Sequence, residues 1–139
     1  MSFERIENLI KNYKKVFGYT PNVEVVVYGK IDLMVTKHCP INKHVGAKNI
    51  GCGECSNDYC LIDRKGYKLD LLNDGLCNIR ILNPKKLHLI NYVSDLIESG
   101  VSRVRLEFTN ETKRETMDVI EGYNVGELEL GGVTNGYFE

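Results

Sequence analysis

All five cysteines of this 139-residue chain lie in a window shorter than a third of its length, at Cys39, Cys52, Cys55, Cys60 and Cys77. Thiols gathered in this way are typical of three chemistries: disulfides, a zinc site or an iron–sulfur cluster. This window constrains the fold more than any other feature, because a metal or a covalent link orders a segment that packing alone leaves loose.

Disulfides are the least favoured of the three. The first residues, Met1 to Arg5, contain neither an apolar core segment nor a small-residue cleavage site, so the sequence does not predict export. An odd number of cysteines also leaves one thiol without a partner. We therefore expect a cytoplasmic protein with reduced thiols.

A metal site explains the spacing better. Cys52 and Cys55 form a C-x-x-C knuckle, and glycines on both sides of Cys52 let the backbone turn tightly enough to aim both sulfurs at one centre. Cys39 and Cys77 are predicted to supply the third and fourth thiolates. Four thiolates suit tetrahedral zinc or a four-iron cluster.

The remaining cysteine and two histidines stay outside the predicted ligand set. Cys60 lies in a strand-like run, where a free thiol usually behaves as a small buried hydrophobe. His38 and His44 are able to ligate zinc in place of a sulfur, but a histidine beside a ligand is more often a supporting or surface residue.

The charge pattern argues against a dedicated nucleic-acid module. Net charge is −1; residues 1–48 hold eight Lys and Arg against four Asp and Glu, and residues 49–139 hold ten against fifteen. Nucleic-acid modules usually have a strongly basic face. A weak RNA contact through the lysines at 11, 14, 15 and 37 stays open, and no apolar run is long enough to cross a membrane.

Apolar periodicity predicts helices over 3–17 and about 89–97, and a third that is capped by Thr109 or Asn110 and buries Met117, Ile120 and Tyr123. Strands are predicted over 23–28, 33–36, 79–82 and 101–108, with a hairpin over 59–72, a loop over 41–56 and an irregular tail over 126–139.

This order predicts one α/β domain over residues 1–139. We expect a partial barrel-like or open, mostly parallel sheet with covering helices, and a cysteine-bearing loop and β-hairpin inserted over 39–77. The strands are too few to close an eight-stranded barrel. An exposed sheet edge would allow two copies to pair as a homodimer.

Several charged or polar residues fall on the predicted strands. Strand ends are where α/β proteins place active-site groups, and Tyr28 and Lys30 end the first strand. Glu24, Arg105 and Glu107 are charged residues on predicted buried strands, and the alternation around Arg105 and Glu107 favours the interpretation that these two face solvent or pair with neighbours.

The sequence resembles the C-terminal part of peptidase family U32. The family signature runs Glu-x-Phe-x-x-Gly to a Cys fifteen positions after the Glu; Glu24, Gly29 and Cys39 match it, with Val26 in place of Phe and Asp32 where a cysteine is common. Further collinear matches are Leu33-Met34-Val35, Cys39-Pro40, Tyr59-x-Leu61-x-Asp63-Arg64-x-Gly66, Asp74 with Cys77, Ile81-x-Asn83, Arg105-x-Glu107-Phe108 and, with Asn135 where Arg is usual, the segment from Gly132 to Phe138.

The resemblance implies a fragment of a longer protein that has a barrel-like α/β catalytic region upstream. Some relatives are described as collagenase-like proteases. Others take part in oxygen-independent hydroxylation of ubiquinone precursors or of tRNA and rRNA bases, and carry a four-iron cluster on cysteines. These relatives favour a [4Fe–4S] cluster on Cys39, Cys52, Cys55 and Cys77, with zinc as the alternative, and the N-terminal part of the parent as a partner.

Three functions therefore stay open. The first is the iron–sulfur portion of a hydroxylation protein, acting on RNA or a small molecule. The second is a peptidase, in which Cys39 or Cys60 pairs with His38 or His44; the sequence has no Gly-x-Ser-x-Gly, His-Glu-x-x-His or paired-aspartate motif to support it. The third is a zinc-stapled structural module without activity of its own.

Overall fold

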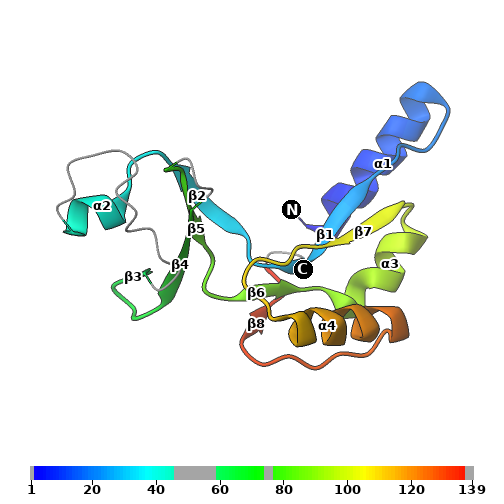
Figure 1. Cartoon of the computed structure of the whole chain (residues 1–139). Helices are drawn as coiled ribbons and strands as arrows, with labels where there is room; N and C mark the ends of the chain where they lie inside the picture. Colours follow the sequence, from blue (N-terminus) through cyan, green and yellow to red (C-terminus); the bar gives the residue numbers. More distant parts are fainter. Residues whose placement is uncertain (1, 46–58, 74–76, 137–139) are drawn as a thin grey trace. The chain divides into compact units, whose positions relative to one another are not determined.

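The computed structural model describes residues 2–45, 59–73 and 77–136 (Figure 1). Contacts within the chain form two compact units: a first unit of Met1–Gly29 with Lys85–Glu139, and a second unit of Lys30–Pro84. Helices and mixed sheets confirm the α/β class, and the described strands form no closed barrel. None of the described helices is both long and apolar enough to cross a membrane.

The first unit contains a four-stranded sheet in the order β7-β1-β6-β8. Strand β1 pairs in parallel with β7, as the strand prediction implies, and antiparallel with β6, while β6 pairs in parallel with β8. Its elements are α1 (Phe3–Phe17), β1 (Glu24–Gly29), β6 (Lys86–His88), the short 3-10 helix η1 (Ile90–Tyr92), α3 (Val93–Glu98), β7 (Arg103–Leu106), α4 (Lys113–Val125) and β8 (Val133–Thr134).

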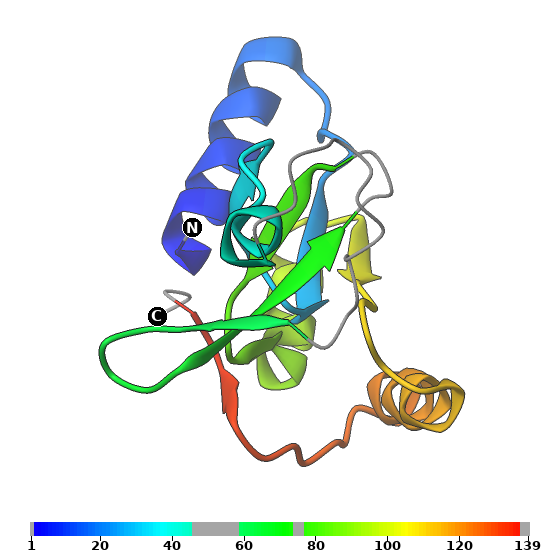
Figure 2. The same ribbon diagram turned by 60° about the vertical axis from the view of Figure 1, so that its left-hand side comes forward.

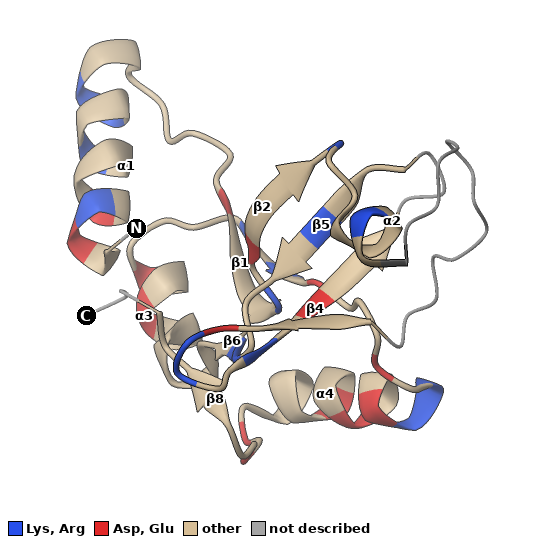
Figure 3. Cartoon of the chain, turned by 90° about the vertical axis from the view of Figure 1, so that its left-hand side faces the viewer, with Lys and Arg blue, Asp and Glu red and all other residues tan. Residues whose placement is uncertain are grey.

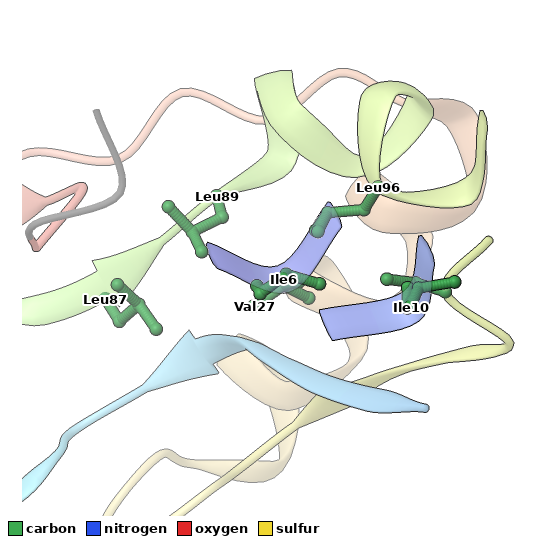
Figure 4. Close-up of a cluster of buried hydrophobic side chains, with 7 residues drawn as sticks. Ile6, Ile10, Val27, Leu87, Leu89 and Leu96 are labelled. Atoms are coloured by element: carbon green, nitrogen blue, oxygen red, sulfur yellow. The ribbon is translucent and has the colours of Figure 1, made fainter. Parts of the chain in front are cut away.

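An aliphatic core holds the first unit together (Figure 4). Helix α1 contributes Ile6 and Ile10, β1 contributes Val27, and Leu96 comes from α3. All four are buried, and each stabilises the fold by about 1.5–3 kcal/mol relative to an exposed side chain. The predicted helix over 3–17 is confirmed, and Gly18 ends it in the left-handed conformation.

The second unit is an antiparallel sheet in the order β2-β5-β4-β3 (Figure 2). Its elements are β2 (Asp32–Thr36), α2 (Pro40–Val45), β3 (Cys60–Ile62), β4 (Lys68–Asn73) and β5 (Ile79–Leu82). The predicted hairpin is confirmed as β3 and β4, and Asp63 Oδ1 closes its turn by accepting from the N–H groups of Lys65 and Tyr67 at 2.7 and 2.9 Å. Parallel pairing is thus confined to the first unit.

Strand β2 lies at one edge of this second sheet. Its side chains Leu33, Met34 and Val35 are all exposed. An exposed apolar edge of this kind is what the predicted pairing between two copies would need.

The start of α2 corrects one prediction. Residues 41–45 were expected in a loop, but they are helical because Cys39 acts as the cap: its Sγ accepts from the Asn42 N–H at 3.3 Å, and its carbonyl accepts from the Lys43 N–H. The buried Ile41 then anchors the helix on the core of the second unit, beside Leu71. The rest of the predicted loop lies outside the described residues.

Helix α4 corrects two further predictions, the identity of its N-terminal cap and the position of its buried side. Its cap is Thr112 rather than Thr109 or Asn110: the Thr112 hydroxyl accepts from the Glu115 N–H, and the Glu115 carboxylate accepts from the Thr112 N–H. Met117 is 49% exposed, because the buried side of the helix runs through Val119 and Gly122 instead. The predicted irregular tail also contains β8, whose two residues are too few to produce a sequence pattern.

Candidate functional site

Cys39 and Cys77 are the two predicted ligands that the structure describes. Both are half-buried and neither forms a disulfide. Cys39 packs against the core of the second unit, and its sulfur accepts a hydrogen bond from the Asn42 N–H. Cys77 has a φ of 61°, a conformation that few residues other than glycine adopt. Such backbone strain is often found at functional positions.

Strand register brings these two cysteines to one end of the second sheet. Thr36, the last residue of β2, pairs with Ile79, the first residue of β5. Cys39 follows Thr36 by three positions and Cys77 precedes Ile79 by two, so the chain leaves and rejoins the sheet at the same end. Strand β3 runs antiparallel to β4 and therefore starts from that end as well. We call this region the cysteine end.

Of the other three cysteines, the structure describes Cys60 alone. Cys52 and Cys55 lie outside the described residues, so their predicted role stays a prediction. Cys60 begins β3 and is exposed, which differs from the buried position expected for it. Across the described ranges no three His, Cys, Asp or Glu side chains are grouped to hold a metal, but half of the predicted set lies outside those ranges. Soft sulfur donors at one sheet end suit zinc or an iron–sulfur cluster.

A second cluster, a buried polar network in the first unit, was not predicted as a group. Tyr28 at the end of β1 is 1% exposed, and the side chain of Glu111, between β7 and α4, has no exposure at all. Lys86 of β6 reaches Glu111 Oε1 at 2.8 Å and the Tyr28 hydroxyl at 3.3 Å. The Tyr28 hydroxyl in turn donates to Glu111 Oε1 at 3.3 Å.

The electrostatics of this network keep each group in its ordinary charge state. Burial by itself raises the pKa of Glu111, but the hydrogen bonds from Lys86 and from the Thr109 N–H outweigh it and hold that pKa below its usual value. Burial alone lowers the pKa of Lys86, and the bonds to Glu111 and Tyr28 reverse that shift, so its pKa is raised. Burial raises the pKa of Tyr28, with Lys86 opposing.

The Glu111 carboxylate has no acceptor position left for a substrate. Its Oε1 accepts from Lys86 and Tyr28, and its Oε2 accepts from the N–H groups of Thr109 and Asn110 at 2.7 and 3.2 Å. A carboxylate offers about four such positions, so Glu111 is saturated. A general base needs a free lone pair within reach of the substrate. The network therefore fastens the segment before α4 to β1 and β6.

Tyr123 continues the buried contacts toward α4. Its hydroxyl donates to the Val27 carbonyl at 2.8 Å and lies 3.2 Å from His88 Nδ1, while His88 Nε2 donates to the Leu128 carbonyl at 3.1 Å. Burial raises the pKa of Tyr123 to about 12. Tyr123 was predicted to be buried, but sequence gave no sign of its partner His88, because β6 is only three residues long.

Gly29 explains one position of the family signature in physical terms. Its φ is 131°, and a Cβ built on it would overlap the carbonyl oxygen of Glu107 and lie 3.2 Å from that carbonyl carbon. The Glu107 N–H donates to the Tyr28 carbonyl at 2.9 Å, so the two segments run in close contact here. Only glycine fits both the conformation and the space.

The charged residues on the strands pair with neighbouring side chains. Arg105 forms ion pairs with Glu24 and Glu107, all partly exposed. Lys30, at the start of the second unit, pairs with Asp70 of β4. These residues therefore serve strand pairing.

Comparison with known proteins identifies a family. The family model described as peptidase family U32 matches residues 1–125. No curated protein was found to be significantly similar to the chain, and no solved structure was either.

Proposed function

Because the chain belongs to peptidase family U32, we propose that its second unit is the metal-binding portion of a redox protein of that family, with a [4Fe–4S] cluster on the four predicted thiolates. Those thiolates are Cys39, Cys52, Cys55 and Cys77. When bound, such a cluster supplies one-electron transfer at a potential set by burial and by hydrogen bonds to sulfur.

The single observation that supports the proposal most is the strand register at the cysteine end. Antiparallel pairing of Thr36 with Ile79 fixes where Cys39 and Cys77 leave the sheet. The segment that carries Cys52 and Cys55 is attached to that end by the start of β3. Cys55 precedes Cys60, the first residue of β3, by five positions in the sequence.

Each described ligand has a defined task in this proposal. The Asn42 N–H donates to Cys39 Sγ and fixes the direction of that sulfur. The packing of Cys39 against Ile41 and Leu71 limits water around the sulfur. Cys77 reaches the same end through a backbone conformation that a bound metal would help to hold.

Peptide hydrolysis is less well supported: Cys60 lines the same pocket as His38 and His44, but among the described residues no hydrogen bond joins the Cys60 sulfur to either histidine. A cysteine nucleophile needs a base within hydrogen-bond reach, and the described partner of the Cys39 sulfur is a backbone N–H rather than a histidine nitrogen. Glu111, the most buried carboxylate of the first unit, is saturated. We therefore prefer the redox assignment within the family.

The test is metal content and absorption of the full chain purified without oxygen. We expect brown protein with about four irons and four sulfides per chain. Replacement of any one of the four predicted ligands by serine should remove most of the iron, whereas Cys60→Ser, the matched control from the same window, should retain it. Stoichiometric zinc with no iron on reconstitution would overturn the iron–sulfur assignment, and equal loss in Cys60→Ser would overturn the ligand set.

A further inference from the structure

The second unit contains a pocket beside the cysteine end. It lies between α2 and the sheet strands β3 and β4 and has a volume of 480 Å³. Ile41 of α2, Leu61 of β3 and Leu71 of β4 form its apolar floor. Pockets that bind small molecules usually have volumes of about 300–1,000 Å³ and mostly apolar walls.

Lys43 is the one Lys, Arg, Asp or Glu among the described residues that line this pocket. Lys43 and His44 of α2 line it, together with a second histidine just before the helix, and all are exposed. Lys43 is the only Lys, Arg, Asp or Glu on α2 (Figure 3). No acidic residue is among the described lining residues, and within the described ranges the Lys43 ammonium has no ion-pair partner.

One aromatic ring completes the wall. Tyr59 is half-buried, directly precedes β3 and packs against the same apolar cluster as Leu61. An aromatic face beside an aliphatic floor accommodates a flat ring, and a flat ring stacked on tyrosine gains about 0.5–1.5 kcal/mol beyond its buried area. The Lys43 ammonium at the rim then attracts a negative group attached to that ring.

From this arrangement we propose that the pocket binds a small aromatic anion, with its ring on the apolar floor and its carboxylate, sulfonate or phosphate at Lys43. The proposed binding uses neither of the predicted ligands that the structure describes, because Cys39 and Cys77 are not among the described residues that line the pocket. A single-stranded nucleic acid is the less favoured occupant, since such strands are bound along a basic groove that follows several phosphates.

Isothermal titration of the full chain with two probes of equal ring size tests the charge requirement. Naphthalene-2-sulfonate should bind more tightly than the uncharged 2-naphthalenemethanol. Lys43→Gln should weaken the sulfonate about three- to fivefold, the range of a partly exposed ion pair, and leave the alcohol unchanged. Lys65→Gln is the matched control, because Lys65 is exposed in the β3–β4 turn of the same unit and lies outside the pocket.

Amide shifts in a ¹H–¹⁵N spectrum locate the binding. The shifts caused by naphthalene-2-sulfonate should concentrate at Leu61, Leu71 and the α2 amides, with Gly18 of the first unit as an unaffected reference. Equal affinity for both probes, an equal effect of Lys65→Gln, or shifts spread outside the second unit would each overturn the proposal. Tighter binding of an oligonucleotide at the same amides would replace the small anion with RNA. Metal content plays no part in these readouts, so this inference and the cluster proposal fail separately.

Discussion

Of the described glycines with positive φ, Gly29 should lose the most unfolding free energy when it is replaced by alanine. Two costs add at this position. The backbone at φ 131° costs a residue with a Cβ about 1–2 kcal/mol, and the new methyl overlaps the backbone of Glu107, which costs about 1–3 kcal/mol more. The hydrogen bond from the Glu107 N–H to the Tyr28 carbonyl holds the Glu107 segment against β1, so the segment as a whole cannot withdraw without breaking that bond.

Gly18→Ala provides the matched control. Gly18 also has a positive φ, 79°, but a Cβ there meets nothing within 4 Å. Its substitution should therefore cost only the conformational part, about 1–2 kcal/mol. The difference between the two variants isolates the steric part, about 1–3 kcal/mol.

Urea unfolding followed by circular dichroism measures both variants. With a slope of about 2 kcal/mol per molar urea, Gly29→Ala should lower the midpoint by about 1–2.5 M and Gly18→Ala by about 0.5–1 M. Equal midpoints for the two variants would show that β1 and the Glu107 segment do not approach as closely as the structure has them, and the explanation of the signature glycine would be wrong.

Two further predictions concern the buried polar network. Glu111→Gln should cost about 2–3 kcal/mol, because the partly buried Lys86 loses its counter-ion. The pKa of Glu111 in the folded state is below its ordinary value, so the stability that its ionised form contributes is present above about pH 4.5 and is lost as pH falls through the lower folded value. The free energy of unfolding, measured against pH, should therefore decline less steeply on the acid side in Glu111→Gln than in the unmodified protein. An unchanged acid slope would contradict the pairing of Glu111 with Lys86. Tyr123→Phe should cost about 1–2 kcal/mol by calorimetry, because the Val27 carbonyl loses a donor, and an unaltered melting temperature would contradict that hydrogen bond.

The candidate site was predictable only where local chemistry left a local signal. Cysteine spacing indicated a thiolate site, and the mixture of apolar periods indicated α/β structure with a hairpin near residue 60. The position of Cys60 was not predictable in the same way, because a strand-like run does not tell an edge strand from a central one. Strand β3 lies at the sheet edge, and Cys60 is exposed there.

The buried network had no sequence signal. Tyr28, Lys86 and Glu111 are separated by up to 83 residues, and each alone has an ordinary local explanation as a strand end, a turn or a helix-terminal charge. Strand β6, which places Lys86 and His88, is too short to show a period of two. Its pairing with β1 is what brings these side chains to Tyr28 and Tyr123.

By itself, the sequence determined the first helix, the central parallel pair of strands, the hairpin and the gathering of thiols, because helical period, β-branched runs, turn residues and cysteine spacing act over short stretches of chain. Tertiary structure alone decided that the first and last of the predicted ligands leave the sheet at one end, that Glu111 is saturated rather than free, and that Gly29 has no room for a methyl group. Those properties depend on strand register and on contacts between distant segments, and neither is encoded in any local pattern.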